Sequence, residues 1–263
     1  IQGSGGSRDV VINAGATVDI NQGLDLGLSG DSPANFTMND GSVQVGSLVV
    51  GPQGTLNYNG GSLTLNTTSV PGGQFSSTTD YDFGFGAVSV TANGVIDVAG
   101  SATVGSILSI DGGSFIAGDL NAVPVLTFTS GLFQINSGLT IGNGALFGSS
   151  FTITQNHHLK TTATTTVKQF STLTLDGGLL ETGSFTNNGT FDFQRGTLRI
   201  TGVGGLNIGS GGALSANVAL STDKILEVTN TATIASDGRL DLSGGRLIAN
   251  QVQINGGVAG HGE

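Results

Sequence analysis

The segment 80–83 carries side chains that could bind a ligand. Asp80 and Asp82 supply two carboxylates, and Tyr81 and Phe83 supply aromatic rings. Carboxylates suit a cation, and a few polar groups beside aromatic rings suit a sugar. A solvated loop with a hydrophobic anchor explains the same residues without a ligand. We therefore treat Asp80, Tyr81, Asp82 and Phe83 as a candidate ligand loop. We expect no cofactor, with a structural cation as the one alternative.

Two adjacent histidines, His157 and His158, form a second candidate ligand loop. Neighbouring side chains on a strand point to opposite faces, so two adjacent imidazoles do not converge on one metal ion. The chain has no cysteine and only one other histidine, His261. We therefore predict no metal site at this pair.

His261 lies between two glycines, and a Gly-His-Gly element also occurs in polygalacturonases, which are right-handed β-helices. Those enzymes use it beside paired aspartates that protonate the glycosidic oxygen and activate water. The Asn-Thr-Asp, Asp-Asp and Arg-Ile-Lys motifs that accompany it are missing from this sequence. We predict that the chain is not an enzyme. A polysaccharide lyase or hydrolase ranks third among the functional hypotheses.

The charge balance narrows the range of partners. The chain of 263 residues has 8 lysines and arginines against 18 acidic residues, a net charge of −10. Without a basic patch, binding to nucleic acid or to anionic lipid is not expected. No apolar run approaches the ~20 residues of a membrane-spanning helix, so we predict no membrane insertion. The lack of cysteine excludes disulfides and thiolate metal sites.

An eight-residue sequence motif recurs through the chain, and the strands that it forms must position the candidate site residues named above. Two apolar residues at alternate positions are followed by a polar or glycine turn and a second apolar segment. Glycine suits such turns because they need backbone angles that a Cβ resists. No segment shows a 3.6-residue apolar period, so we predict an all-β chain with essentially no helix. Seven copies begin at Phe36, Leu56, Leu108, Leu126, Leu173, Phe191 and Leu240.

The spacing of the turns predicts how the strands stack. Equivalent turn residues recur at a similar interval in three pairs, Asn39/Asn59, Asp111/Thr129 and Asp176/Gln194. Periods of about 20 residues are typical of solenoids, in which each coil buries its apolar face against its neighbours. We predict one domain over 1–263, a right-handed parallel β-helix of about a dozen coils; the hand follows from the general crossover preference.

Two stretches break the pattern, at about 66–86 and 148–170. The first contains the segment 80–83 and the second contains the two adjacent histidines. We expect both to be irregular insertions, that is, elongated corners or protrusions on one side. Such insertions often form the binding face of a solenoid protein.

Glycine-leucine phrases connect this chain with a known kind of protein. The segments Gly60–Leu63, Gly177–Leu180, Gly244–Leu247 and Asn188–Phe191 resemble the β-strand repeats of bacterial autotransporter passengers and of other large exported bacterial surface proteins. The closing Gly256–Gly262 is similar to the glycine-rich step between such repeats. The resemblance implies a β-helical scaffold at the bacterial cell surface or outside the cell.

From these observations we predict an extracellular structural protein that assembles with itself. A solenoid exposes unpaired strands and an open core at its ends, and these invite strand addition from another copy. Head-to-tail stacking would form a surface filament or matrix. The alternative is an adhesin-type passenger that binds a glycan or a host protein through its insertions. The candidate assembly ends are Val10, Val11 and Ile12 at one end and Val252 and Ile254 at the other.

Overall fold

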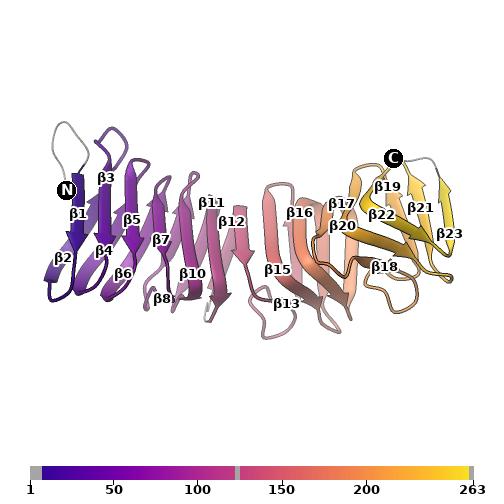
Figure 1. Ribbon diagram of the computed structural model, residues 1–263, viewed down its shortest axis with the longest axis horizontal. Helices are drawn as coiled ribbons and strands as arrows, with labels where there is room; N and C mark the ends of the chain where they lie inside the picture. Colours follow the sequence, from indigo (N-terminus) through magenta and orange to yellow (C-terminus); the bar gives the residue numbers. More distant parts are fainter. Residues whose placement is uncertain (1–7, 122–124, 261–263) are drawn as a thin grey trace. The chain divides into compact units, whose positions relative to one another are not determined.

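The computed structural model describes residues 8–121 and 125–260 (Figure 1). Strands make up 69% of the structure, and these described residues include no helix. The strands stack in parallel coils that form a β-solenoid of about 12 turns. The predicted all-β parallel β-helix is thereby confirmed, while its right-handed sense stays a prediction. The chain forms two compact units, residues 1–134 and 135–263.

Three parallel ladders build the first unit. The first ladder joins β1, β3, β5, β7, β10 and β11. The second ladder consists of two parts, one that joins β2, β4 and β6 and one that joins β8, β10 and β11. The third ladder joins β2, β4, β6, β9 and β11. The strands are β1 Arg8–Ile12, β2 Thr17–Leu26, β3 Ala34–Met38, β4 Ser42–Val50, β5 Gly54–Tyr58, β6 Ser62–Pro71, β7 Gln74–Ser77, β8 Tyr81–Asp82, β9 Val88–Thr91, β10 Val95–Thr103, β11 Ile107–Leu120 and β12 Val125–Ile135.

The second unit continues the same construction with strands β13 to β23. The longest ladder joins β15, β16, β17, β20 and β22, and a separate three-stranded sheet joins β19, β21 and β23. The strands are β13 Leu139–Ile141, β14 Ser150–Thr154, β15 His157–Val167, β16 Thr172–Asn187, β17 Thr190–Ile200, β18 Leu206–Ile208, β19 Asn217–Ser221, β20 Lys224–Ile234, β21 Arg239–Ser243, β22 Arg246–Ile254 and β23 Gly257–Gly260.

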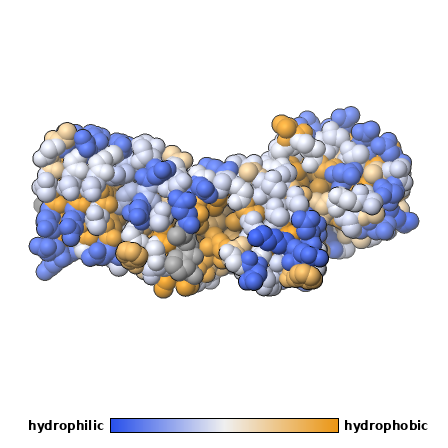
Figure 2. Space-filling view, turned by 90° about the horizontal axis from the view of Figure 1, so that it is seen from below, coloured by the Kyte–Doolittle hydropathy of each residue, from blue (hydrophilic) through white to orange (hydrophobic). Residues whose placement is uncertain are grey.

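The core is a set of apolar side chains stacked coil on coil. Alternate residues of each strand point inward, and the parallel register places equivalent residues of successive coils on top of one another. One such row runs through Phe36, Leu56, Phe75, Ile96 and Phe115, and every member is at most 2% exposed. Burying one large side chain of this kind contributes about 1.5–3 kcal/mol. The outward positions carry many polar residues, and Figure 2 shows hydrophilic and hydrophobic residues interspersed on one face.

The repeated motif forms the tight corners that the sequence predicts. Gly41 and Gly61 occupy the same corner in successive coils, with φ of 90° and 94°. A Cβ added at Gly61 would lie 2.7 Å from the carbonyl oxygen of Gly41, so neither the conformation nor the space admits a side chain. From Ala34 to Ser114 the partners in the first ladder follow one another at intervals close to the predicted period.

The two stretches expected as irregular insertions belong to the ladders instead. In 66–86, β7 pairs with β5 and β10, and β8 pairs with β10. In 148–170, β14 and β15 both pair with β16. The ladder is made by main-chain groups, so polar or aromatic side chains at unexpected positions do not prevent a segment from pairing.

Candidate functional site

The two aromatic residues of the segment 80–83 point into the core. Tyr81 is 4% exposed and Phe83 is 1% exposed. Their rings pack against each other with centroids 4.7 Å apart, and Phe75 lies 5.0 Å from Tyr81 and 5.3 Å from Phe83. The hydroxyl of Tyr81 donates to the carbonyl of Leu63 at 3.1 Å, and burial raises the pKa of this hydroxyl far above its usual value. These rings are therefore core residues, although Tyr81 also lines a shallow groove on the surface.

The two carboxylates of the same segment hold the local main chain. Asp80 accepts a hydrogen bond from the N–H of Ser101 at 2.7 Å, and Asp82 accepts one from the N–H of Gly84 at 2.8 Å. Both aspartates border a groove of about 300 Å³. No group of three His, Cys, Asp or Glu side chains suited to a metal ion occurs within 8–121 and 125–260. The geometry therefore fits corner capping.

The adjacent histidines lie on opposite faces of β15. His157 is buried: its ring stacks on Phe151 with centroids 6.1 Å apart, and its Nδ1 accepts the N–H of Thr154 at 3.2 Å. His158 points the other way, with its Nε2 3.7 Å from a carboxylate oxygen of Glu181. The two imidazoles thus face different environments. His261, the third histidine, lies outside the described residues.

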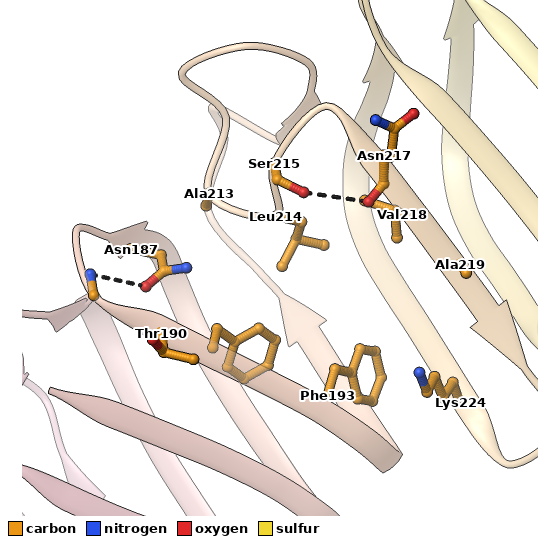
Figure 3. Close-up of a pocket in the computed structure, with 12 residues that line it drawn as sticks. Asn187, Thr190, Phe193, Ala213, Leu214, Ser215, Asn217, Val218, Ala219 and Lys224 are labelled. Carbon is orange, nitrogen blue, oxygen red and sulfur yellow. Dashed lines mark hydrogen bonds between the residues drawn. The ribbon is translucent and has the colours of Figure 1, made fainter.

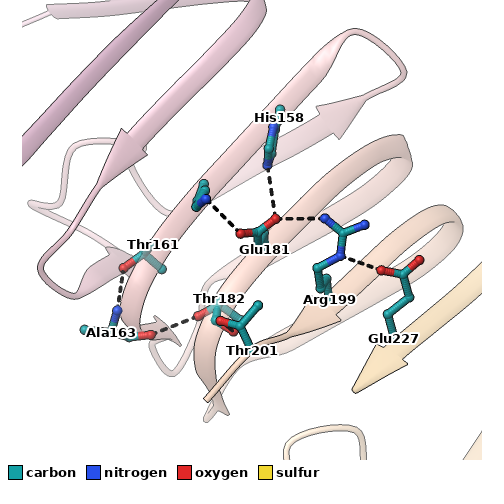
Figure 4. Close-up of polar contacts among 9 residues, drawn as sticks. His158, Thr161, Ala163, Glu181, Thr182, Arg199, Thr201 and Glu227 are labelled. Carbon is teal, nitrogen blue, oxygen red and sulfur yellow. Dashed lines mark hydrogen bonds and ion pairs between the residues drawn. The ribbon is translucent and has the colours of Figure 1, made fainter. Parts of the chain in front are cut away.

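Ionic side chains of alternating sign form a row across successive coils of the second unit (Figure 4). The register aligns Lys160 of β15, Glu181 of β16, Arg199 of β17 and Glu227 of β20. The carboxylate of Glu181 lies 3.0 Å from Lys160 Nζ and 2.9 Å from Arg199 Nη1, and the Nε of Arg199 donates to Glu227. We call these four residues the charge ladder.

Burial and ion pairing shift the pKa values of Glu181 and of its neighbour His158. Burial alone would raise the pKa of Glu181, but hydrogen bonds from Lys160 and Arg199 outweigh it and leave this pKa below its ordinary value. Burial lowers the pKa of the neighbouring His158, against the attraction of Glu181. A general acid needs a carboxyl group that keeps its proton near neutral pH, and Glu181 has the opposite tendency. The charge ladder therefore links successive coils through ion pairs.

A groove of about 460 Å³ opens where one ladder is interrupted (Figure 3). On one side lies the first half of β17, with Phe191 and Phe193; on the other lies β19, with Val218 and Ala219. Lys224 lies at one end of the groove, with its Nζ 5.7 Å from the centroid of the Phe193 ring. We call this feature the β17/β19 groove.

The sequence hypotheses did not include the β17/β19 groove, although a signal for it exists. The coil that runs from Leu180 to its partner Leu198 has an ordinary length. The next coil, from Leu198 to its partner Leu226, is clearly longer, as the residue numbers show. The coil after that, from Leu226 to Leu247, is again close to the usual length. Coil length alone is not a specific signal, because the coil from Leu139 to its partner Thr165 is almost as long.

The candidate assembly ends differ in their exposure. In the final coil described, Val252 and Ile254 are 44% and 55% exposed, and Val258 is 45% exposed. Their partners in the preceding coil, Ala232, Ile234 and Leu240, are at most 1% exposed. The final coil thus repeats the inward-facing apolar pattern, but no described coil covers it.

The first strand divides its three candidate residues between two faces. Val10 and Ile12 stand in register with the core residues Phe36 and Met38, so they point inward. Val11 pairs with Thr37, points outward and is 53% exposed. Within the described residues, β1 pairs with β3.

Comparison with known proteins adds no relative. No family model, no curated protein and no solved structure matches this chain. Within the described ranges, no helix is long and apolar enough to cross a membrane.

Proposed function

We propose that this chain is a non-enzymatic structural protein of the bacterial cell exterior, in which further copies extend the solenoid end to end. The observation that carries the proposal is the exposed apolar row of the final coil, formed by Val252, Ile254 and Val258. The support for an exterior location is the resemblance of the glycine-leucine repeats to those of exported bacterial surface proteins.

The end strands offer the two interactions that strand addition needs. An open edge presents main-chain N–H and C=O groups for a parallel ladder, and the half-exposed apolar row provides surface to bury. At the other end, the inward-facing Val10 and Ile12 of β1 would offer apolar side chains to the next copy. Because the two end surfaces differ, the contact is heterologous, and its repetition along the solenoid axis builds an open filament.

An adhesin that binds a glycan or a host protein is the weaker candidate. Its proposed binding segments, 66–86 and 148–170, pair within the ladders, and the two rings of the first segment are buried. The proposal of a structural protein includes no cofactor, no nucleic acid and no lipid partner, in keeping with the net charge of −10.

Negative-stain electron microscopy with size-exclusion chromatography tests this function. We expect filaments from the purified chain at neutral pH. Ile254→Lys should abolish them, because stacking would bury a charge in the apolar row. Val203→Lys is the matched control, since Val203 is 95% exposed in a corner away from the end strands. A monodisperse chain at all concentrations, or equal filament formation by both variants, would refute end-to-end assembly.

A further inference from the structure

The β17/β19 groove separates two strand segments that would otherwise pair across the long coil. If their inward-facing residues were matched, Phe191 would face Val218 and Phe193 would face Leu220. Instead, β17 pairs with β16 on one side, β19 pairs with β21 on the other, and the two belong to different sheets. Two parallel strand edges therefore line the groove, together with the corner 213–215 that precedes β19.

The hydrogen bonds of the outer pairs identify the main-chain groups that face the groove. Along a strand, the N–H and C=O of one residue point to one edge, and those of the next residue point to the other. Thr190 donates to Ser171 of the preceding coil, so Phe191 and Phe193 turn their groups toward the groove. Arg239 donates to Ala216, so Ala219 faces the groove from the other side.

The core is also open at this place. Leu173 and Leu175, one coil earlier, are fully buried, whereas their register partners Phe191 and Phe193 are only half-buried. Val218 and Leu220 across the groove are buried. A strand inserted here could cover the two phenylalanine rings with its own inward-facing side chains.

The groove has one closed end, which limits what can enter. Beyond Arg195, β17 pairs directly with β20, and the N–H of Gly196 donates to the carbonyl of Asp223 at 2.8 Å. An inserted strand parallel to β17 would run toward this closed end and could not continue past it in the ladder. About four extended residues, ~13 Å, fit alongside Thr190–Phe193.

A cation lies at the closed end. Lys224 lines the groove there, and no carboxylate within the described ranges forms an ion pair with its ammonium group. The carboxyl end of a parallel strand would arrive next to this ammonium group. An antiparallel strand that starts there would instead bring its own amino-terminal charge to the lysine.

We propose that the β17/β19 groove binds the free carboxyl-terminal segment of another polypeptide by strand addition, parallel to β17. The main chain of the segment pairs with Phe191 and Phe193 on one side and with Ala219 on the other. Apolar residues at alternate positions cover the phenylalanine rings, and the terminal carboxylate pairs with Lys224. This site is separate from the end strands, so it stands or falls independently of the proposed end-to-end assembly.

A library of peptides with four random residues at a free carboxyl end provides the probe. We expect selection on the whole chain to enrich apolar residues at alternate positions. By fluorescence polarisation, the enriched peptide as a free acid should bind about tenfold more tightly than its carboxyl amide, because a charge-assisted contact is lost. Lys224→Met should remove this preference, while Lys168→Met, which deletes an exposed lysine elsewhere in the second unit, should keep it.

A proline substitution separates main-chain pairing from side-chain contact. Ala219→Pro deletes a groove-facing N–H but none of the bonds to β21, and proline is tolerated at such an edge. It should abolish peptide binding, whereas Ala219→Ser, which keeps the N–H, should not; circular dichroism verifies that both variants are folded. The proposal is overturned if selection enriches no sequence, or if acid and amide bind equally. Self-association of the free chain that Ala219→Pro removes would assign the groove to a second copy and also overturn it.

Discussion

Glu181 and Arg199 stand one coil apart in register, and Arg199 Nη1 lies 2.9 Å from the Glu181 carboxylate. The side chain of Glu181 is only 12% exposed, and Lys160 approaches it from the coil on the other side. Main-chain pairing holds these successive coils together, and charged side chains add a second connection. The Glu181 carboxylate thus has an ion-pair partner in the coil on each side of it.

Glu181→Gln should destabilise the second unit. The substitution leaves Lys160 without a counter-ion and Arg199 with Glu227 alone, and removing one partner of a partly buried network costs about 1–3 kcal/mol. Urea-induced unfolding followed by circular dichroism measures the change. Asp176→Asn is the control, because its partner Arg195 is 55% exposed and such pairs contribute at most about 1 kcal/mol. Equal effects of the two substitutions would contradict a special role for the charge ladder.

Stability should depend on pH through His158. Burial lowers the pKa of this imidazole in the folded chain, so below the ordinary value of about 6.5 the unfolded chain binds the proton more readily. The stabilisation is thus present above pH 6.5 and is lost as the pH falls toward the lower folded pKa. Urea midpoints measured from pH 7.5 to pH 5 should fall, and His158→Gln should flatten this decline. An unchanged slope in the variant would exclude His158 as the source.

Glu181 should add a second loss of stability at lower pH. Hydrogen bonds from Lys160 and Arg199 keep its folded pKa below the ordinary value, so its contribution is present above that value and is lost as the pH falls through the folded pKa. The same urea series, extended below pH 4.5, measures this loss in the native chain. In Glu181→Gln that part of the decline should be missing while the His158 part remains.

Gly61→Ala should cost more stability than a glycine substitution at an open corner. At Gly61 the positive φ and the carbonyl oxygen of Gly41, 2.7 Å from the added Cβ, act together. Gly30→Ala has a similar φ of 88° but meets no atom within 4 Å, so only the conformational cost of about 1 kcal/mol applies. Thermal unfolding of both variants measures the difference. Equal losses would mean that the coils shift apart easily at this corner.

Local chemistry explains why the coils could be predicted before the structure was known. Alternating apolar residues identify strands, and a glycine such as Gly61 identifies a corner, whichever coil lies next to it. The opposite orientations of His157 and His158 follow from strand geometry alone and agree with their different burial. The apolar pattern at Val252 and Ile254 also followed from the sequence, because the final coil repeats the core residues of the coil before it.

The residues that could not be interpreted from the sequence depend on contacts between distant segments. A strand shifted by one residue turns all its side chains to the other face, so only the register could decide that Tyr81 and Phe83 belong to the core.

The groove beside Phe193 exists because the coil from Leu198 to Leu226 is longer than the coils on either side of it. The additional residues of a long coil can form a longer corner or can interrupt the ladder. Which of the two occurs depends on how the coils on both sides pair. Sequence alone therefore determined the strands, the corners and their stacking, since these follow from neighbouring residues. The tertiary structure decided which side chains are buried and where the ladder opens, since both depend on pairing between coils.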